Sequence, residues 1–151
     1  MLRVRKIYVY GKKDKGNRHR DRKSVNEREF ISRRGDNDDN TDYGKYGRDV
    51  SFLHYNTMEE FVNSPEGKLC LKKNIFGEDI LVEGDEWDTL SQGDILIIGS
   101  ATFKLSFVKK HCILPCGLKN RDISCPIDEN WFFASVLETG KVRVGDNIKK
   151  Q

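Results

Sequence analysis

Three of the four cysteines in this chain, Cys112, Cys116 and Cys125, lie within one short polar segment. Two lysines precede them, and neighbouring positive charge favours the thiolate form of a cysteine. The thiolate is the form that acts as a nucleophile and as a ligand for soft metals. We call residues 109–125 the cysteine segment, and its composition makes it the first candidate for thiol or metal chemistry.

Two other interpretations of the cysteine segment stay open. The three cysteines and His111 form a set of four zinc ligands, and the Cys-x3-Cys spacing is within the zinc range. His111 is adjacent to Cys112, however, so both side chains would have to turn inward from consecutive positions. Alternatively, each cysteine is a separately buried small residue, since free cysteine is often buried. The fourth cysteine, Cys70, lies in an apolar strand-like pattern and is expected in the core.

The composition predicts one small domain under a heavily charged surface. The chain has 151 residues, of which 36% are hydrophobic and 34% charged. Its formal net charge of +3 gives no general argument for a nucleic-acid partner. The basic excess is local, within residues 11–29, which we interpret as a long solvated loop that lacks regular structure. A patch for phosphate or nucleic acid is the alternative there, although no aromatic residue is interleaved with the charges.

The sequence also predicts a compartment. The first residues lack the apolar run of a signal peptide, and no stretch approaches the ~20 apolar residues that a membrane helix needs. We therefore expect a cytoplasmic protein with no membrane partner, in which thiols stay reduced. Four cysteines in such a chain indicate metal or thiol chemistry rather than a disulfide framework.

Strand patterns dominate the chain. Residues 101–108 alternate strictly, with Phe103, Leu105 and Phe107 on one face, which indicates a half-buried strand. Many short strands with glycine turns between them predict a mainly β domain, a barrel or a sandwich, with a few short helices. The predicted strands cover residues 3–10, 48–55, two adjacent stretches within 94–108, and a last pair within 141–148.

Two short helices are predicted. One starts at the capping-box pattern of residues 57–60 and stops at residues 64–67. The other covers residues 129–138, with Asp128 as its N-cap and Gly140 as its end.

The order of several motifs resembles the MOSC family, named after the C-terminal domain of molybdenum cofactor sulfurase, and in particular its short stand-alone bacterial members. The segment NIFGEDILVEG is similar to the family's Phe-Gly/Ala-Glu-Asn signature, and the cysteine spacing resembles that of the short members. The N-terminal half matches more loosely, at Gly35–Asp36 and Arg48–Ser51. The segments that carry the resemblance are 74–84, 90–99, 107–118 and 130–146.

The resemblance implies a β-barrel-like fold for residues 1–151 and a role in molybdenum-cofactor metabolism. Family members are proposed to carry sulfur as a cysteine persulfide or to bind the molybdenum–pterin cofactor through a loop cysteine. Cys116 matches that metal-ligating position best. The remaining expected site residues are Cys112 as a resolving thiol or second ligand, and Arg48, Asp36, Glu78 and Cys125 around the cofactor, with the basic loop near its phosphate.

The chain departs from the family pattern at three positions, where Asp38, Asp79 and Trp131 replace a histidine, an asparagine and a glycine. The two acidic replacements would repel a cofactor phosphate. We therefore keep three hypotheses: a sulfur carrier or molybdopterin-binding protein, whose partner is the cofactor or a sulfur-donor or acceptor protein; a non-catalytic domain with a structural zinc; and a MOSC fold used for protein interaction. The sequence alone does not decide whether the protein is an enzyme.

Overall fold

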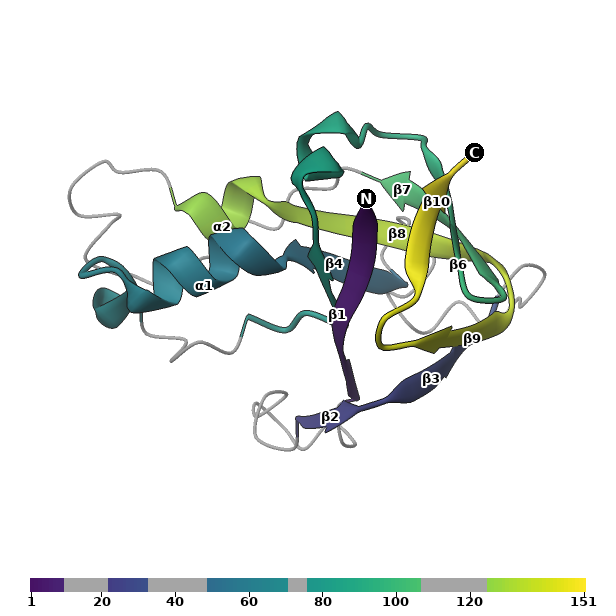
Figure 1. The fold of residues 1–151 in the computed structure, drawn as a ribbon, viewed down its shortest axis with the longest axis horizontal. Helices are drawn as coiled ribbons and strands as arrows, with labels where there is room; N and C mark the ends of the chain where they lie inside the picture. Colours follow the sequence, from purple (N-terminus) through teal and green to yellow (C-terminus); the bar gives the residue numbers. More distant parts are fainter. Residues whose placement is uncertain (10–21, 33–48, 71–75, 107–124) are drawn as a thin grey trace, which may run out of the picture.

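The computed structural model describes residues 1–9, 22–32, 49–70, 76–106 and 125–151. Nearly all of these residues belong to one β-barrel and a helical layer on its outside (Figure 1). The described strands are β1 (Leu2–Val9), β2 (Lys23–Val25), β3 (Glu27–Phe30), β4 (Val50–His54), β5 (Ile80–Glu83), β6 (Ile95–Ile98), β7 (Ala101–Ser106), β8 (Trp131–Glu138), β9 (Gly140–Arg143) and β10 (Asn147–Lys150).

The barrel is closed by the two ends of the chain. Its strands follow the order β10-β6-β7-β8-β4-β5-β1, and β1 pairs again with β10, with Leu2 opposite Ile148. All these pairs are antiparallel except β4–β5. Strand β2 extends the sheet beside β1, and β3 pairs with β9 in a separate two-stranded sheet. The predicted mainly β barrel is therefore confirmed.

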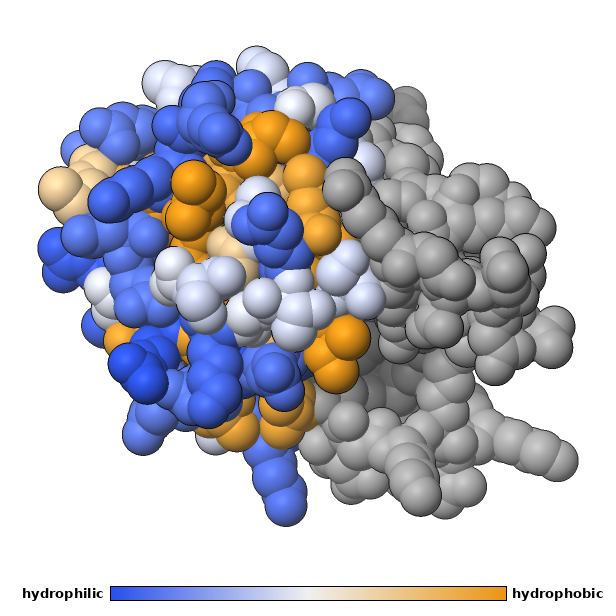
Figure 2. Space-filling model, turned by 90° about the vertical axis from the view of Figure 1, so that its right-hand side faces the viewer, coloured by the Kyte–Doolittle hydropathy of each residue, from blue (hydrophilic) through white to orange (hydrophobic). Residues whose placement is uncertain are grey.

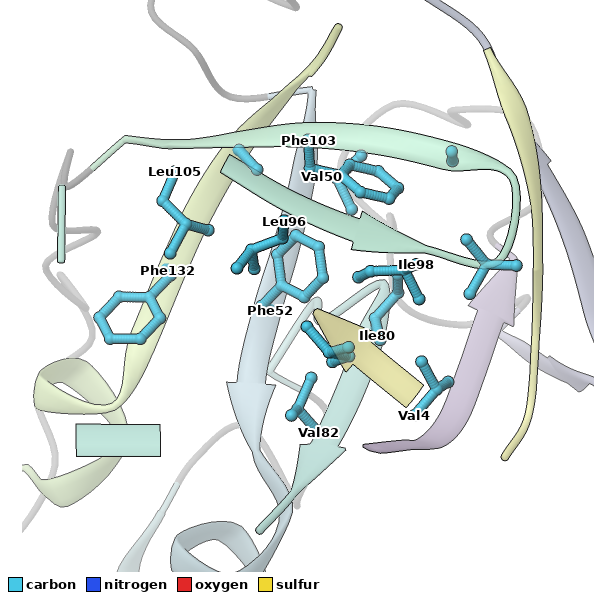
Figure 3. Packing of buried hydrophobic residues seen from close by; sticks show 14 of the residues in the cluster. Val4, Val50, Phe52, Ile80, Val82, Leu96, Ile98, Phe103, Leu105 and Phe132 are labelled. Atoms are coloured by element: carbon cyan, nitrogen blue, oxygen red, sulfur yellow. The ribbon is translucent and has the colours of Figure 1, made fainter. Parts of the chain in front are cut away.

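The barrel interior is the main hydrophobic core. In β7 the residues Ala101, Phe103 and Leu105 are buried and alternate with more exposed neighbours, as the period-two pattern predicts. The Phe103 ring packs edge-on against Phe52, with ring centroids 5.6 Å apart. Figure 3 shows these side chains, with those of neighbouring strands, converging inside the barrel. The strand predictions for residues 3–10, 48–55, 94–108 and 141–148 hold within the described residues, except that Tyr55 begins a helix.

A second apolar layer covers the outer face of β4, β5 and β8. Helix α1 (Tyr55–Asn63), the 3-10 turn η1 (Gly67–Leu69) and helix α2 (Pro126–Glu129) pack there, and α1 contacts both of the others (Figure 1). A second 3-10 turn, η2, spans Asp85–Thr89. We call the apolar set between helices and barrel the outer cluster; its buried members are Tyr8, Leu53, Met58, Phe61, Phe76, Leu81, Ile127, Trp131 and Phe133.

The predicted helix over residues 129–138 is wrong, because this segment forms strand β8. Phe132 and Ala134 point into the barrel core, whereas Trp131 and Phe133 join the outer cluster. A strand buried on both faces has a continuous apolar run instead of an alternation, so its sequence resembles that of a short buried helix. The helical turn instead precedes the strand as α2, with Cys125 rather than Asp128 at its N-cap, and Gly140 begins β9.

Three smaller predictions are also corrected. The basic loop predicted for residues 11–29 contains β2 and part of β3, two short strands that need little apolar sequence because they are largely exposed. Helix α1 begins at Tyr55, before the predicted capping box, and Thr57 Oγ1 instead lies 2.9 Å from His54 Nδ1. Cys70 follows η1 and is half-buried, not part of a strand. Residues 10–21 of the basic loop lie outside the described residues.

Candidate functional site

The signature segment of residues 76–79 enters β5 through a sharp turn that places two adjacent carboxylates side by side. Gly77 has a φ of 85°, a left-handed conformation that favours glycine. Of the two carboxylates that follow, Glu78 is 1% exposed and Asp79 is partly exposed. Phe76, which precedes this turn, belongs to the outer cluster.

Glu78 is paired with an arginine from the edge of β2. Arg22 Nη1 donates to Glu78 Oε1 at 2.6 Å, and the backbone N–H of Phe76 donates to Oε2 at 3.2 Å. The Arg22 guanidinium also lies over the Tyr8 ring, 3.9 Å from its centroid, a cation–π geometry. Burial raises the pKa of Glu78 above its ordinary value of 4.5, although Arg22 opposes the shift.

Asp79 is paired with a second arginine and with β4. Arg28 Nη1, from β3, donates to Asp79 Oδ1 at 2.7 Å and to the carbonyl oxygen of Tyr8 at 2.8 Å. The other carboxylate oxygen accepts the Ser51 backbone N–H at 2.9 Å and lies 3.0 Å from Ser51 Oγ. The Asp79 backbone N–H donates to Ser51 Oγ at 3.0 Å. Asp79 is therefore fixed to two elements at once.

We call Arg22, Arg28, Ser51, Glu78 and Asp79 the Arg–carboxylate cluster. Its two arginines offset its two carboxylates, so the negative charge of Asp79, which was expected to repel a phosphate, has a cation at 2.7 Å. Carboxylates that hold guanidinium groups in place leave those groups pre-organised, and guanidinium is well suited to phosphate recognition. Because both arginine side chains are already held in place, an anionic group that bound them would lose less conformational entropy than one that had to order two free arginines.

Sequence reasoning found only Glu78 and Asp79 of this cluster. Arg22 belonged to the basic run, and no spacing in the sequence indicated which of its many charges would meet the signature segment. Arg28 carried no functional signal, and Ser51 was noted only as the end of the Arg48–Ser51 segment that resembles a family strand. Recognising that residues 23–30 form strands would have helped to find both arginines, because β2 pairs with β1, Arg22 lies over the Tyr8 ring of β1, and Arg28 donates to the Tyr8 carbonyl.

Cys125 is the cysteine of the segment that the structure describes. It is half-buried at the N-terminus of α2 and packs against the outer cluster, as Cys70 does. Burial is the main cause that raises the pKa of the Cys125 thiol, so the thiol form is favoured at neutral pH. Cys112, Cys116, Arg48 and Asp36 lie outside the described residues.

The described residues nearest to this undescribed stretch are Ser106 and Cys125. Ser106 pairs with Phe133 of β8, and Phe133 pairs in turn with Ser51 of β4. Ser106 is thus two strands away from a member of the Arg–carboxylate cluster, in the same cross-strand row. Cys125, the last residue of the cysteine segment, packs against the outer cluster.

The structure gives no metal site among the described residues, in which no three His, Cys, Asp or Glu side chains gather in a way that could hold an ion. The zinc ligands considered above lie outside these residues except for Cys125. Within the described part of the chain, no helix is long and apolar enough to cross a membrane.

Solved structures share this architecture over the full chain. YiiM from Geobacillus stearothermophilus matches with a TM-score of 0.68 and 16% identity, over 100% of this chain and 75% of that one. The fold is MOSC-like. YuaD from Bacillus subtilis matches with a TM-score of 0.60 and 15% identity, over 98% and 94% of the two chains. YiiM from Escherichia coli matches with a TM-score of 0.54 and 17% identity, over 99% and 69%.

These likenesses bear on the fold of the chain. They agree with the MOSC resemblance of the sequence motifs, and the segment that resembles the family signature forms the turn into β5 that carries Glu78 and Asp79. No protein-family model matches the sequence, and no curated protein matches it.

Proposed function

We propose that this MOSC-like protein carries sulfur as a persulfide on Cys116, or binds the molybdenum–pterin cofactor through the same thiolate. The observation that supports the proposal is the Arg–carboxylate cluster on the MOSC signature segment. Ser106, the last described residue before the cysteine segment, is in the same cross-strand row as Ser51 of this cluster. A soft thiolate suits both roles, as a metal ligand and as a carrier of sulfane sulfur.

Two guanidinium groups are the part of the cluster that would contact an anionic ligand in this proposal. Arg22 is held by the buried Glu78 and stacked on Tyr8, and Arg28 is held by Asp79 and a backbone carbonyl. Such anchoring reduces the conformational freedom that two long side chains would otherwise lose on binding. In this proposal the cluster holds the phosphate end of the pterin, and Arg48 and Asp36 contribute from the segment that precedes β4.

Sulfur transfer in this proposal needs the cysteines of the chain, a donor persulfide and a cellular thiol as reductant. The Cys116 thiolate attacks the outer sulfur of the donor persulfide, a new sulfur–sulfur bond forms on Cys116, and the donor leaves as a thiolate. The Cys112 thiolate then attacks the inner sulfur of this persulfide, which forms a Cys112–Cys116 disulfide and releases the outer sulfur as hydrosulfide to the acceptor; a cellular thiol reduces the disulfide before the next cycle. A donor or acceptor protein is the implied partner.

The test is a pair of cysteine variants of the full chain. Cys116→Ser should lose bound molybdenum or sulfane sulfur while its melting temperature stays within about 2 °C of wild type, because in this proposal the thiol serves chemistry rather than core packing. Cys70→Ser should keep that loading and lose stability, since Cys70 packs against the outer cluster.

Two outcomes would contradict the proposal. Full loading of Cys116→Ser would show that another residue carries the sulfur or the metal. A sharp fall in the melting temperature of Cys116→Ser, together with bound zinc in the wild type, would support the structural-zinc hypothesis, because metal binding contributes folding free energy.

A further inference from the structure

Two free thiols lie on the same apolar layer outside the barrel. Cys70 follows η1 and Cys125 precedes α2, and α1 packs against both of these elements. Both cysteines are half-buried and both pack against the outer cluster. Two segments separated by more than fifty residues in sequence therefore bring their sulfur atoms to one region of the surface.

The surroundings of Cys125 agree with this placement. Burial is the largest cause that raises the pKa of Cys125, and negative charge on Asp128 and on Cys70 raises it further. The backbone N–H groups of Asp128 and Ile127 act in the opposite direction. Coupling of this kind requires the two sulfur atoms to be near each other, and it supports the placement given by their shared packing.

We propose that Cys70 and Cys125 form a reversible disulfide, a thiol-modification site separate from the Cys116 chemistry above. The oxidant in this step is a small disulfide such as oxidised glutathione. One protein thiolate attacks the small disulfide and releases one glutathione thiolate, which takes up the lost proton. The second protein thiolate then attacks the mixed disulfide and releases the other glutathione, so two thiols are oxidised and one small disulfide is reduced.

The position of this disulfide links it to the candidate site. Cys125 ends the cysteine segment, and Cys70 precedes the signature residues Phe76–Asp79 by only a few positions. A bond between them joins the residue that ends the cysteine segment to the residue that shortly precedes the signature segment in the sequence. It also closes a loop of about 55 residues, and closing a long loop stabilises the folded state mainly by restricting the unfolded chain.

The experiment maps the disulfide in the full-length protein. The reduced protein is incubated with oxidised glutathione, free thiols are blocked with iodoacetamide, and a digest is analysed by mass spectrometry without reductant. We expect a peptide linked through Cys70 and Cys125, and a melting temperature about 5–10 °C higher than that of the reduced protein, reversed by dithiothreitol. The oxidation should be faster at pH 9 than at pH 7, because the Cys125 thiol must ionise.

Two variants separate this site from the other cysteines. The double variant Cys112→Ser, Cys116→Ser should keep both the linked peptide and the rise in melting temperature, whereas Cys70→Ser should lose both. The proposal is overturned if the wild type links Cys125 to Cys112 or Cys116. It is equally overturned if the double variant gives only glutathione adducts on Cys70 and Cys125. These results are independent of cofactor loading, so they do not depend on the proposed function.

Discussion

Glu78 and Asp79 are neighbours in sequence, yet they experience different environments. Glu78 is fully buried, and burial dominates its ionisation in spite of an arginine at 2.6 Å. Asp79 is partly exposed and accepts hydrogen bonds from two elements. A buried ion pair with a large desolvation cost contributes little net stability and is better explained by specificity or function. A contribution to stability is therefore a weaker explanation for the Arg22–Glu78 pair than for the other contacts of the cluster.

The raised pKa of Glu78 predicts how stability depends on pH. A carboxyl whose folded pKa is raised stabilises the fold below its unfolded pKa of about 4.3, and this contribution is lost as pH rises through the folded value. Glu78→Gln keeps the shape and removes the charge. Its melting temperature should therefore rise relative to wild type as pH increases from 4 to 7, measured by thermal unfolding across that range.

A matched control has the opposite sign. Glu27 is hydrogen-bonded to Arg143 and Lys141, and these contacts lower its pKa. A lowered pKa gives stability that is present above the unfolded pKa and lost as pH falls through the folded value. Glu27→Gln should therefore lose stability relative to wild type as pH rises. If Glu78→Gln and Glu27→Gln show the same pH trend, our description of the Glu78 environment is wrong.

Arg28 offers a direct test of the cluster as an anion site. Arg28→Ala removes the ion pair with Asp79 and the hydrogen bond to the Tyr8 carbonyl, which should cost about 1–2 kcal/mol of stability. If the cluster binds phosphate groups, the affinity for pyrophosphate, measured by calorimetry, should also fall about tenfold. Arg5→Ala is the control, because Arg5 pairs with Glu83 at 3.7 Å and is largely exposed. Equal losses of affinity in both variants would argue against the cluster.

At the level of elements, secondary structure was predicted correctly for strands with one buried face and wrongly for the strand that is buried on both faces. Strand β7 shows a clean alternation because one face meets the core and the other is more exposed. Strand β8 lies between the barrel core and the outer cluster, and its run of aromatic residues has no period that distinguishes strand from helix. Strands β2 and β3 were missed because partner strands, rather than their own sequence, hold them in place.

Gly140 shows how closely two elements approach in this barrel. A Cβ atom at Gly140 would lie 2.2 Å from the Ser100 carbonyl carbon and 2.4 Å from the Ala101 nitrogen, both backbone atoms. Gly140→Ala should therefore lower the free energy of unfolding by about 3 kcal/mol, as measured by urea denaturation.

Gly93→Ala provides the comparison for that variant. Gly93 has a φ of 88°, but a Cβ atom added there would meet nothing within 4 Å, so alanine at this position meets backbone strain alone. We expect a cost of about 1–2 kcal/mol. A Gly140→Ala variant no less stable than Gly93→Ala would show that β9 and the β6–β7 turn are not in such close contact.

At the scale of the whole molecule, the closed barrel explains why the site was only partly predictable. The resemblance to family motifs indicated the signature segment, and the concentration of three cysteines in a polar run indicated the cysteine segment. Neither observation indicated that Arg22 and Arg28 would meet the signature segment. Those contacts depend on β1 pairing with β2, β5 and β10 together, which is a property of the closed topology rather than of any local pattern.

The same topology distinguishes the barrel core from the outer cluster. Side chains fill the barrel interior, so we look for a binding site on the outer face of the strands. In the view of Figure 2, charged and polar residues surround smaller apolar areas on the described part of one face. The candidate site lies on the outer face of the strands, where the signature segment meets the edge of the outer cluster.

The most direct test of the account is the content of the wild-type protein itself. The full-length chain is purified from a host supplied with molybdate, and molybdenum, zinc, pterin and sulfane sulfur are measured per chain. The account predicts about one equivalent of molybdenum with pterin, or about one sulfane sulfur that alkylation maps to Cys116. One equivalent of zinc, or a protein that contains none of these groups after incubation with a persulfide donor, would contradict it.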